Sequence, residues 1–184
     1  MKINKILIIA LLMLASAAMG QKYVTKTGSI KFFSDAPMEK IEAYNNQVNA
    51  ALDTETGDLV FKVLMKSFTF EKALMQEHFN ENYVESDKFP NATFVGKITN
   101  AGEIGFQKGG TFDAQVEGKL TIHGVTRSVK ELGSLTVSDG KILTTSVFPI
   151  KLSDYEIKIP KTVASNISES VEITVEVSLA ILNQ

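Results

Sequence analysis

The sequence predicts an all-β domain of about eight antiparallel strands with one inserted short helix. Two long segments, Val171 to Ile181 and Phe112 to His123, alternate apolar and mostly polar residues with a period of two, as a strand with one buried face does. Between Glu71 and Glu85 the period changes to that of a helix. The spacing of these segments is typical of a sandwich or an up-and-down barrel.

The first twenty residues have the layout of a secretory signal peptide. Lys2 and Lys5 precede an apolar run from Ile6 to Leu14, and the small residues Ala15 to Ala18 follow it. The run is too short to span a bilayer as an anchor. We therefore expect cleavage after Gly20, a single domain over residues 21–184, and a periplasmic or secreted protein.

Three strands are expected before the helix. Tyr23 to Phe33 is the first, and the residues from Asp35 to Pro37 break it. Gln47 to Leu52 is the second. The turn cluster from Asp53 to Gly57 connects it to a third strand, Leu59 to Met65, so the two strands have the spacing of a hairpin.

Two segments are expected to be helical. Met38 to Tyr44 is compatible with a helical turn. The segment from Glu71 to Glu85 is the clear helix, because Met75, Phe79 and Tyr83 follow one another at steps of four residues. We interpret this apolar stripe as a plug for one end of a barrel, and a mobile lid over an apolar cavity is the alternative.

The strands after the helix are separated by turn residues. A strand carrying Phe94 precedes the long alternating strand that starts at Thr111. Asp139 and Gly140 form a hairpin turn, which predicts that Ser134 to Val137 pairs with Lys141 to Pro149.

Charge and cysteine content exclude several classes of protein. Residues 1–20 hold two of the 19 Lys and Arg and none of the 21 Asp and Glu, so the rest of the chain has a net charge of −4. A mildly acidic chain without a basic cluster is a poor candidate for nucleic acid binding. Since there is no Cys, an exported domain must be stabilised by its core without disulfides.

The chain offers few groups for chemistry. His78 and Glu81, three residues apart, make only a weak metal half-site, and a solvated helix face explains them better. His123 ends a strand, so we expect a turn histidine satisfied by backbone groups. Asp154 and Glu156 are expected on one side of a short strand, in solvent. We expect no enzyme, no metal and no cofactor.

Three sequence stretches resemble the YceI-like family. Gly118 to Val129 contains LTIHGVT followed by Arg127 and is similar to the family signature LTIHGVTK. Glu85 to Phe94 resembles the segment D-x-x-KFPxATF, and Ser153 to Ile157 resembles the later DFGI. The resemblance implies a secreted or periplasmic bacterial protein with a lipocalin-like, up-and-down antiparallel barrel. It also implies a long polyisoprenoid or similar lipid tail inside that barrel, as in several family members.

Within such a barrel, the inward apolar positions are the candidate ligand-binding residues. An eight-stranded barrel is either filled by side chains or holds one slender ligand. None of the inward candidates is ionisable, so we expect apolar burial to hold a guest. The candidates on strands, followed by two on the helix, are Ile30, Phe32, Phe61, Val63, Phe94, Phe112, Val116, Ile122, Phe148, Val175, Val177, Met75 and Phe79.

The favoured function is sequestration or carriage of an isoprenoid-like or fatty-acid-like lipid, with release at a membrane or to an acceptor protein. The alternative is a filled barrel that acts through its outer surface as a secreted stress or protein-interaction module. An exposed barrel end would permit a homodimer without requiring one.

Overall fold

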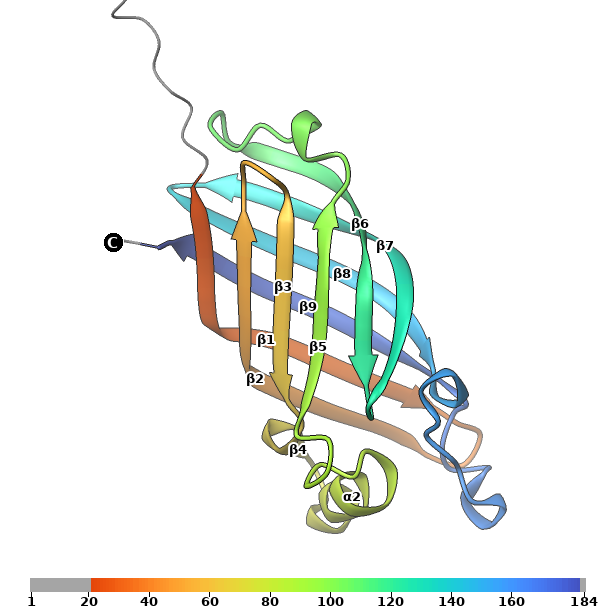
Figure 1. Ribbon diagram of the computed structural model, residues 1–184. Helices are drawn as coiled ribbons and strands as arrows, with labels where there is room; N and C mark the ends of the chain where they lie inside the picture. The colour runs from red at the N-terminus through yellow and green to blue at the C-terminus, as the bar shows by residue number, and fades with distance from the viewer. Residues whose placement is uncertain (1–20, 183–184) are drawn as a thin grey trace, which may run out of the picture.

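Eight antiparallel strands form a closed barrel in the computed structural model, which describes residues 21–182 (Figure 1). A ninth, two-residue strand pairs with β2 outside the barrel. In chain order, the strands are β1 Lys22–Asp35, β2 Lys40–Asp53, β3 Asp58–Leu64, β4 Thr69–Phe70, β5 Asn91–Ile98, β6 Gly110–Ile122, β7 Val125–Ser138, β8 Lys141–Lys151 and β9 Ser170–Ile181.

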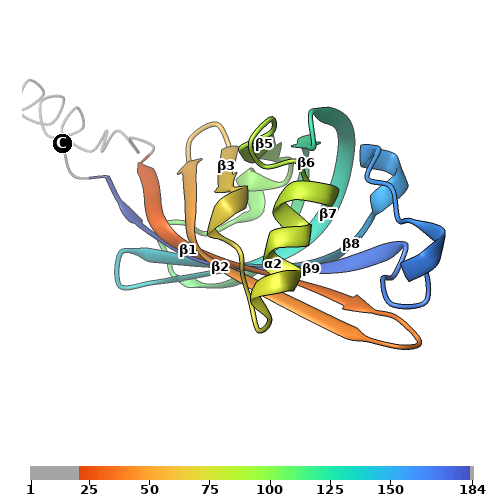
Figure 2. The same ribbon diagram turned by 90° about the horizontal axis from the view of Figure 1, so that it is seen from below.

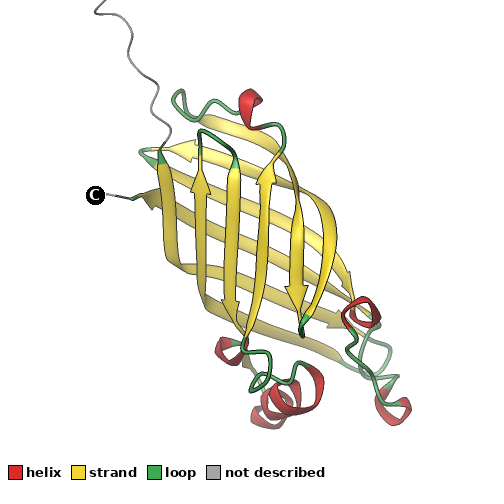
Figure 3. Ribbon diagram, in the orientation of Figure 1, coloured by secondary structure: helices red, strands yellow, loops and turns green. Residues whose placement is uncertain are grey.

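The topology is up-and-down. Apart from β4, each strand pairs with the strands before and after it in the chain, and β1 pairs with both β2 and β9. Because β1 has a hydrogen-bonded neighbour on each side, the sheet closes on itself and a sandwich is excluded. The fold-class prediction is therefore confirmed, and within residues 21–182 one short α-helix accompanies the strands, together with shorter helical turns (Figure 3).

Hairpin turns determine the register on the two sides of β7. His123 and Gly124 have φ of 51° and 75°, and Asp139 and Gly140 have φ of 50° and 71°. Two consecutive residues with positive φ are typical of the tight hairpin turn whose twist matches that of the strands. The predicted hairpin at Asp139 is confirmed over residues 134–138 and 141–145, but residues 146–149 of the predicted partner strand pair only with β9.

The segment Met38 to Tyr44 is not helical as predicted. It contains the start of β2, which pairs with β1 from Lys40 onward, and Ala43 is fully buried. The ladder to β1 satisfies the backbone of this segment, which overrides its weak local preference. Asp154 and Glu156 are also not on a strand. Asp154 lies in the 3₁₀ helix η5, Leu152–Tyr155, and Glu156 caps the C-terminus of that helix with a φ of 58°.

Short helices lie at both ends of the barrel (Figure 3). The helix α2, Ala73–His78, continues into a π-helical turn, η3, Phe79–Tyr83, so the predicted helix is present but shorter. The remaining 3₁₀ turns are η2 Met65–Ser67, η4 Ala101–Glu103 and η6 Lys161–Val163. Over residues 21–182, none of these helices has the length and apolar character needed to cross a bilayer.

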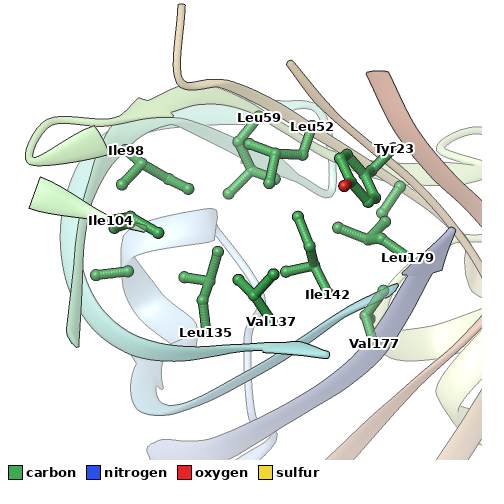
Figure 4. Close-up of a cluster of buried hydrophobic side chains, with 12 residues drawn as sticks. Tyr23, Leu52, Leu59, Ile98, Ile104, Leu135, Val137, Ile142, Val177 and Leu179 are labelled. Atoms are coloured by element: carbon green, nitrogen blue, oxygen red, sulfur yellow. The ribbon is translucent and has the colours of Figure 1, made fainter. Parts of the chain in front are cut away.

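One end of the barrel is filled by side chains (Figure 4). Leu52, Ile142 and Leu179 are almost fully buried there, and Ile104 from the loop after η4 completes the packing. A second buried cluster lies toward the end that carries α2 and includes Met65, which follows β3. Between the two clusters the interior is not filled.

Candidate functional site

An internal cavity of about 440 Å³ lies in the barrel between the filled end and α2. All eight barrel strands contribute to its wall, together with α2, η3 and the segment around η6. Its walls are predominantly apolar, and the volume lies in the range usual for small-molecule sites, about 300–1,000 Å³. The strands place these side chains inside because alternate residues of every strand face the barrel axis.

Most of the sequence-predicted positions lie on this cavity. Eleven of the thirteen candidates line it: Ile30, Phe32, Phe61, Val63, Met75, Phe79, Phe94, Val116, Ile122, Phe148 and Val175. Phe112 and Val177 do not, because both belong to the filled end, where Val177 is fully buried. Alternation predicts which side of a strand faces inward, but it does not give the depth of a residue along the barrel axis.

Other lining residues were missed by the sequence reasoning. Leu120 and Ile173 line the cavity and occupy the same inward alternation as Val116 and Val175, so that pattern was sufficient to find them. Phe68, by contrast, comes from the connection after η2 and carries no periodic signal.

A pair of glycines lets one aromatic ring lie flat against the cavity wall. Gly96 on β5 and Gly118 on β6 are directly opposite in the ladder. A Cβ on Gly118 would lie 2.6 Å from the Cα of Gly96 and 2.6 Å from the Cζ of Phe94. Any larger residue at either position would therefore displace the Phe94 ring from the wall.

An aromatic cluster holds α2 and η3 over the other end of the cavity. The ring of Phe79 lies 5.6 Å from that of Phe32, 5.6 Å from that of Phe68 and 5.0 Å from that of Phe70, centroid to centroid. Such pairs each add about 0.5–1.5 kcal/mol beyond burial. Tyr83, on the next turn, also lines the cavity, and burial raises the pKa of its phenol. The apolar side of α2 and η3 therefore covers this end of the barrel, and Phe79 and Tyr83 also line the cavity.

Polar contacts cross the rim of the cavity near α2. The Nζ of Lys72, just before α2, lies 2.9 Å from the Oε1 of Glu39 in the turn between β1 and β2. The Nδ2 of Asn166 donates a longer hydrogen bond, 3.4 Å, to the other Glu39 oxygen. The hydrogen bond from Lys72, more than any other effect, lowers the pKa of Glu39. His78 is exposed, as expected for a solvated helix face, and it also lines the cavity at this rim.

The cavity is not free of ionisable side chains, contrary to the sequence-based expectation. Glu131 on β7 faces Val116 on the neighbouring strand and lines the cavity wall. Burial raises the pKa of its carboxyl group. The apolar alternation does not predict this inward position, because Glu131 and Gly133 interrupt it between Val129 and Leu135.

A second hollow of about 370 Å³ opens between β7 and β8. The two strands stop pairing beyond Ser134 and Thr145, although β7 extends back to Val125 and β8 forward to Lys151 (Figure 2). We call this hollow the side groove. Five residues line both the side groove and the cavity, so the two spaces adjoin: Leu120, Val129, Glu131, Phe148 and Ile150.

His123 is held in the barrel wall by hydrogen bonds at both ring nitrogens and does not line the cavity. Its Nε2 lies 2.8 Å from Oε2 of Glu85, and its Nδ1 lies 3.1 Å from the backbone oxygen of Tyr155. Only one partner is a backbone group, so the expectation of backbone satisfaction alone is incomplete. The hydrogen bond to His123 lowers the pKa of Glu85. The ring of His123 also contacts Phe89 edge-on, at 4.8 Å between centroids.

These contacts explain why the three motif stretches occur together. His123 lies in the first stretch, Glu85 and Phe89 in the second, and Tyr155 in the third. The motifs therefore join a hairpin turn, the segment after η3 and the helix η5 at one side of the barrel. In the described part of the chain, residues 21–182, no three His, Asp or Glu side chains converge as a metal site would require.

A closed up-and-down barrel around an apolar cavity defines a lipocalin-like barrel. The YceI-like domain family matches residues 22–179, and the chain therefore belongs to the YceI-like family. No curated protein sequence is significantly similar to the chain.

Three solved structures are similar in fold. A polyisoprenoid binding domain from Saccharophagus degradans implicated in plant cell wall breakdown has a TM-score of 0.76 at 15% identity, over 89% of this chain and 99% of that one. BcnA of Burkholderia cenocepacia has a TM-score of 0.65 at 18% identity, over 83% and 96%. The YceI protein of Campylobacter jejuni has a TM-score of 0.56 at 18% identity, over 76% and 84%.

Proposed function

We propose that this protein is an exported lipid-binding protein that sequesters or carries a long, isoprenoid-like chain in its barrel. The observation that carries the proposal is the apolar cavity of about 440 Å³ in a barrel that is closed by hydrogen bonds. Membership of the YceI-like family supports it, as does the fold shared with a domain described as polyisoprenoid binding.

The strength of binding would come from apolar burial. Each buried methylene contributes about 0.8 kcal/mol, so one five-carbon isoprene unit adds on the order of 3 kcal/mol before the costs of ordering are subtracted. A guest of several units would leave slowly into water. Release would then need a membrane or an acceptor protein to receive the tail.

Export and the absence of covalent chemistry are parts of the same proposal. The lysines and apolar run at the N-terminus are the basis for export, and they lie outside the described residues. The cavity-lining residues hold no cysteine, and His123 is engaged by Glu85 and Tyr155 away from the cavity. Carriage of an unmodified ligand fits these residues better than catalysis.

The alternative of a filled barrel acting through its surface agrees less well with the structure. One end of the barrel is filled, but the space between that end and the cover formed by α2 and η3 is hollow and apolar. The same space is the reason to test for a ligand directly.

The test is to purify the protein from its native host, extract it with organic solvent and identify the extract by mass spectrometry. We expect a lipid with a long apolar tail. In parallel, protein stripped of lipid should bind a fluorescent hydrophobic probe saturably, and long-chain isoprenoids should displace that probe. A protein that yields no lipid and binds no probe would refute carriage.

A further inference from the structure

The junction of the cavity and the side groove carries a chemical group that the tail of a lipid does not use. Glu131 lines both spaces, among the apolar side chains of Val129, Phe148 and Ile150. Within residues 21–182 its carboxylate has no hydrogen-bond or ion-pair partner within the usual distances. A half-buried carboxylate without a partner costs stability. The oxygens of Glu131 are accessible from the open space at the junction, so a group that enters there can donate a hydrogen bond to them.

Four other charged residues line the side groove, and all four are exposed: Arg127, Lys130, Lys151 and Asp154. Arg127 donates its Nε hydrogen to the backbone oxygen of Asp154 at 2.8 Å. Lys130 pairs with Glu117 on the outer face of β6 at 2.7 Å. Lys151 ends β8 and is exposed.

The last ionisable side chain of the groove is Tyr155. Its phenol is buried, which raises its pKa; the negative charge of Asp154 raises it further, Arg127 lowers it, and Glu131 adds a smaller increase.

We propose that the side groove receives the polar head of the lipid whose tail fills the cavity, and that Glu131 accepts a hydrogen bond from an uncharged head such as a hydroxyl group. This assignment rests on the proposed function. The head then completes the hydrogen bonding of the carboxylate, and the tail continues past Phe148 into the apolar space. The missing ladder between β7 and β8 leaves the room for the head.

Glu131 also disfavours an anionic head. A phosphate at this junction would place a second negative charge beside a carboxylate in apolar surroundings, where charge repulsion is poorly screened. Glu39 at the rim near α2 is a second carboxylate on the cavity wall. A lipid alcohol satisfies Glu131 without that repulsion, whereas the positive charges of Arg127, Lys130 and Lys151 lie on exposed side chains that solvent screens.

The experiment compares lipids that share a twenty-carbon tail. Geranylgeraniol, its methyl ether and geranylgeranyl phosphate are titrated into the full protein stripped of lipid, and dissociation constants are measured at low and moderate salt. The alcohol should bind on the order of tenfold more tightly than the ether, which lacks the donor, and more tightly than the phosphate. Glu131→Gln, which keeps an acceptor oxygen, should keep alcohol binding and improve phosphate binding about tenfold.

Glu176→Gln is the matched control. It removes one negative charge from an exposed residue of β9 that does not line the cavity, and the ratio of alcohol to phosphate affinity should not change. Equal or tighter binding of the phosphate by the unmodified protein overturns the assignment, as does the same shift in both variants. If none of the three lipids binds, the proposed function itself fails.

The location of the head is tested separately. A geranylgeraniol analogue with a diazirine beside the hydroxyl should cross-link, on illumination, to residues 127–131 or 148–151. Cross-linking at the rim near Glu39 instead would show that the head lies at the α2 end and would overturn the assignment, while leaving carriage of the tail intact.

Discussion

Phenylalanine at Val116 and at Val177 should have opposite effects on stability, although both residues are inward valines on strands. Val116 lines the open cavity, whereas Val177 is fully buried in the filled end. There, a Cβ on Gly28 would lie 2.7 Å from the Cγ2 of Val177, which shows how little free space surrounds that side chain. The pair of variants thus tests whether the interior is empty around Val116 and packed around Val177.

The structure allows the size of the difference to be worked out. Val116→Phe adds about four carbons that can be buried in the cavity, worth up to about 3 kcal/mol, from which side-chain ordering subtracts about 1 kcal/mol. Val177→Phe overpacks a closed core at a cost of about 1–3 kcal/mol. The two variants should differ by about 4 kcal/mol, or by roughly 8–16 °C in Tm for a domain of this size.

Differential scanning calorimetry of lipid-free protein measures this difference. Val116→Phe should unfold at or above the temperature of the unmodified protein, and Val177→Phe clearly below it. Val116→Phe should also weaken geranylgeraniol binding, because the new ring occupies space used by the tail. Equal destabilisation by both substitutions would mean that the interior around Val116 is already packed, and the reasoning about the cavity would be refuted.

Three further predictions follow from particular contacts. The raised pKa of Glu131 means that its ionised form costs stability; this cost is absent below the ordinary value of 4.5 and appears as pH rises through the raised pKa. Glu131→Gln should therefore raise Tm at pH 7 and leave it unchanged near pH 4 in a calorimetric pH series, and a lower Tm at pH 7 would contradict this. Phe79→Ala removes three aromatic contacts and should lower the free energy of urea unfolding by about 2–4 kcal/mol. The same variant should release a bound probe faster in stopped-flow measurements. An unchanged release rate would show that η3 does not retain the ligand. In His123→Asn, the asparagine tolerates the positive φ but loses the hydrogen bond to Tyr155. The free energy of urea unfolding should therefore fall by about 2 kcal/mol, with no change in ligand affinity. Weakened affinity would place His123 in the ligand site.

The inward alternation predicted much of the cavity wall but not its shape. Val116, Phe148 and Val175 were identified as inward because neighbouring side chains on a strand point to opposite faces. Phe112 and Val177 fit the same pattern equally well, yet the loop carrying Ile104 packs against their end of the barrel and fills it. Periodicity describes one strand at a time, whereas a void depends on which loops and strands meet at each level.

Residues outside the regular strands make contacts in the site that sequence periodicity does not predict. The aromatic ring of Phe68 reaches the cavity from the short connection after η2, and Lys72 reaches Glu39 across 33 residues of chain. Similarly, the early part of β2 was expected to be helical, because its pairing with β1 is a contact between segments and leaves little trace in local composition.

The sequence by itself determined an all-β chain with one short helix, and its motif stretches pointed to the YceI-like family. Those features are local: alternation, turn residues and short stretches of specific residues are all written along the chain. Only the tertiary structure decided that the barrel is filled at one end and hollow between that end and α2, and that β7 separates from β8 beside Glu131. Both depend on contacts among side chains distant in sequence, and the sum of those contacts sets where space remains.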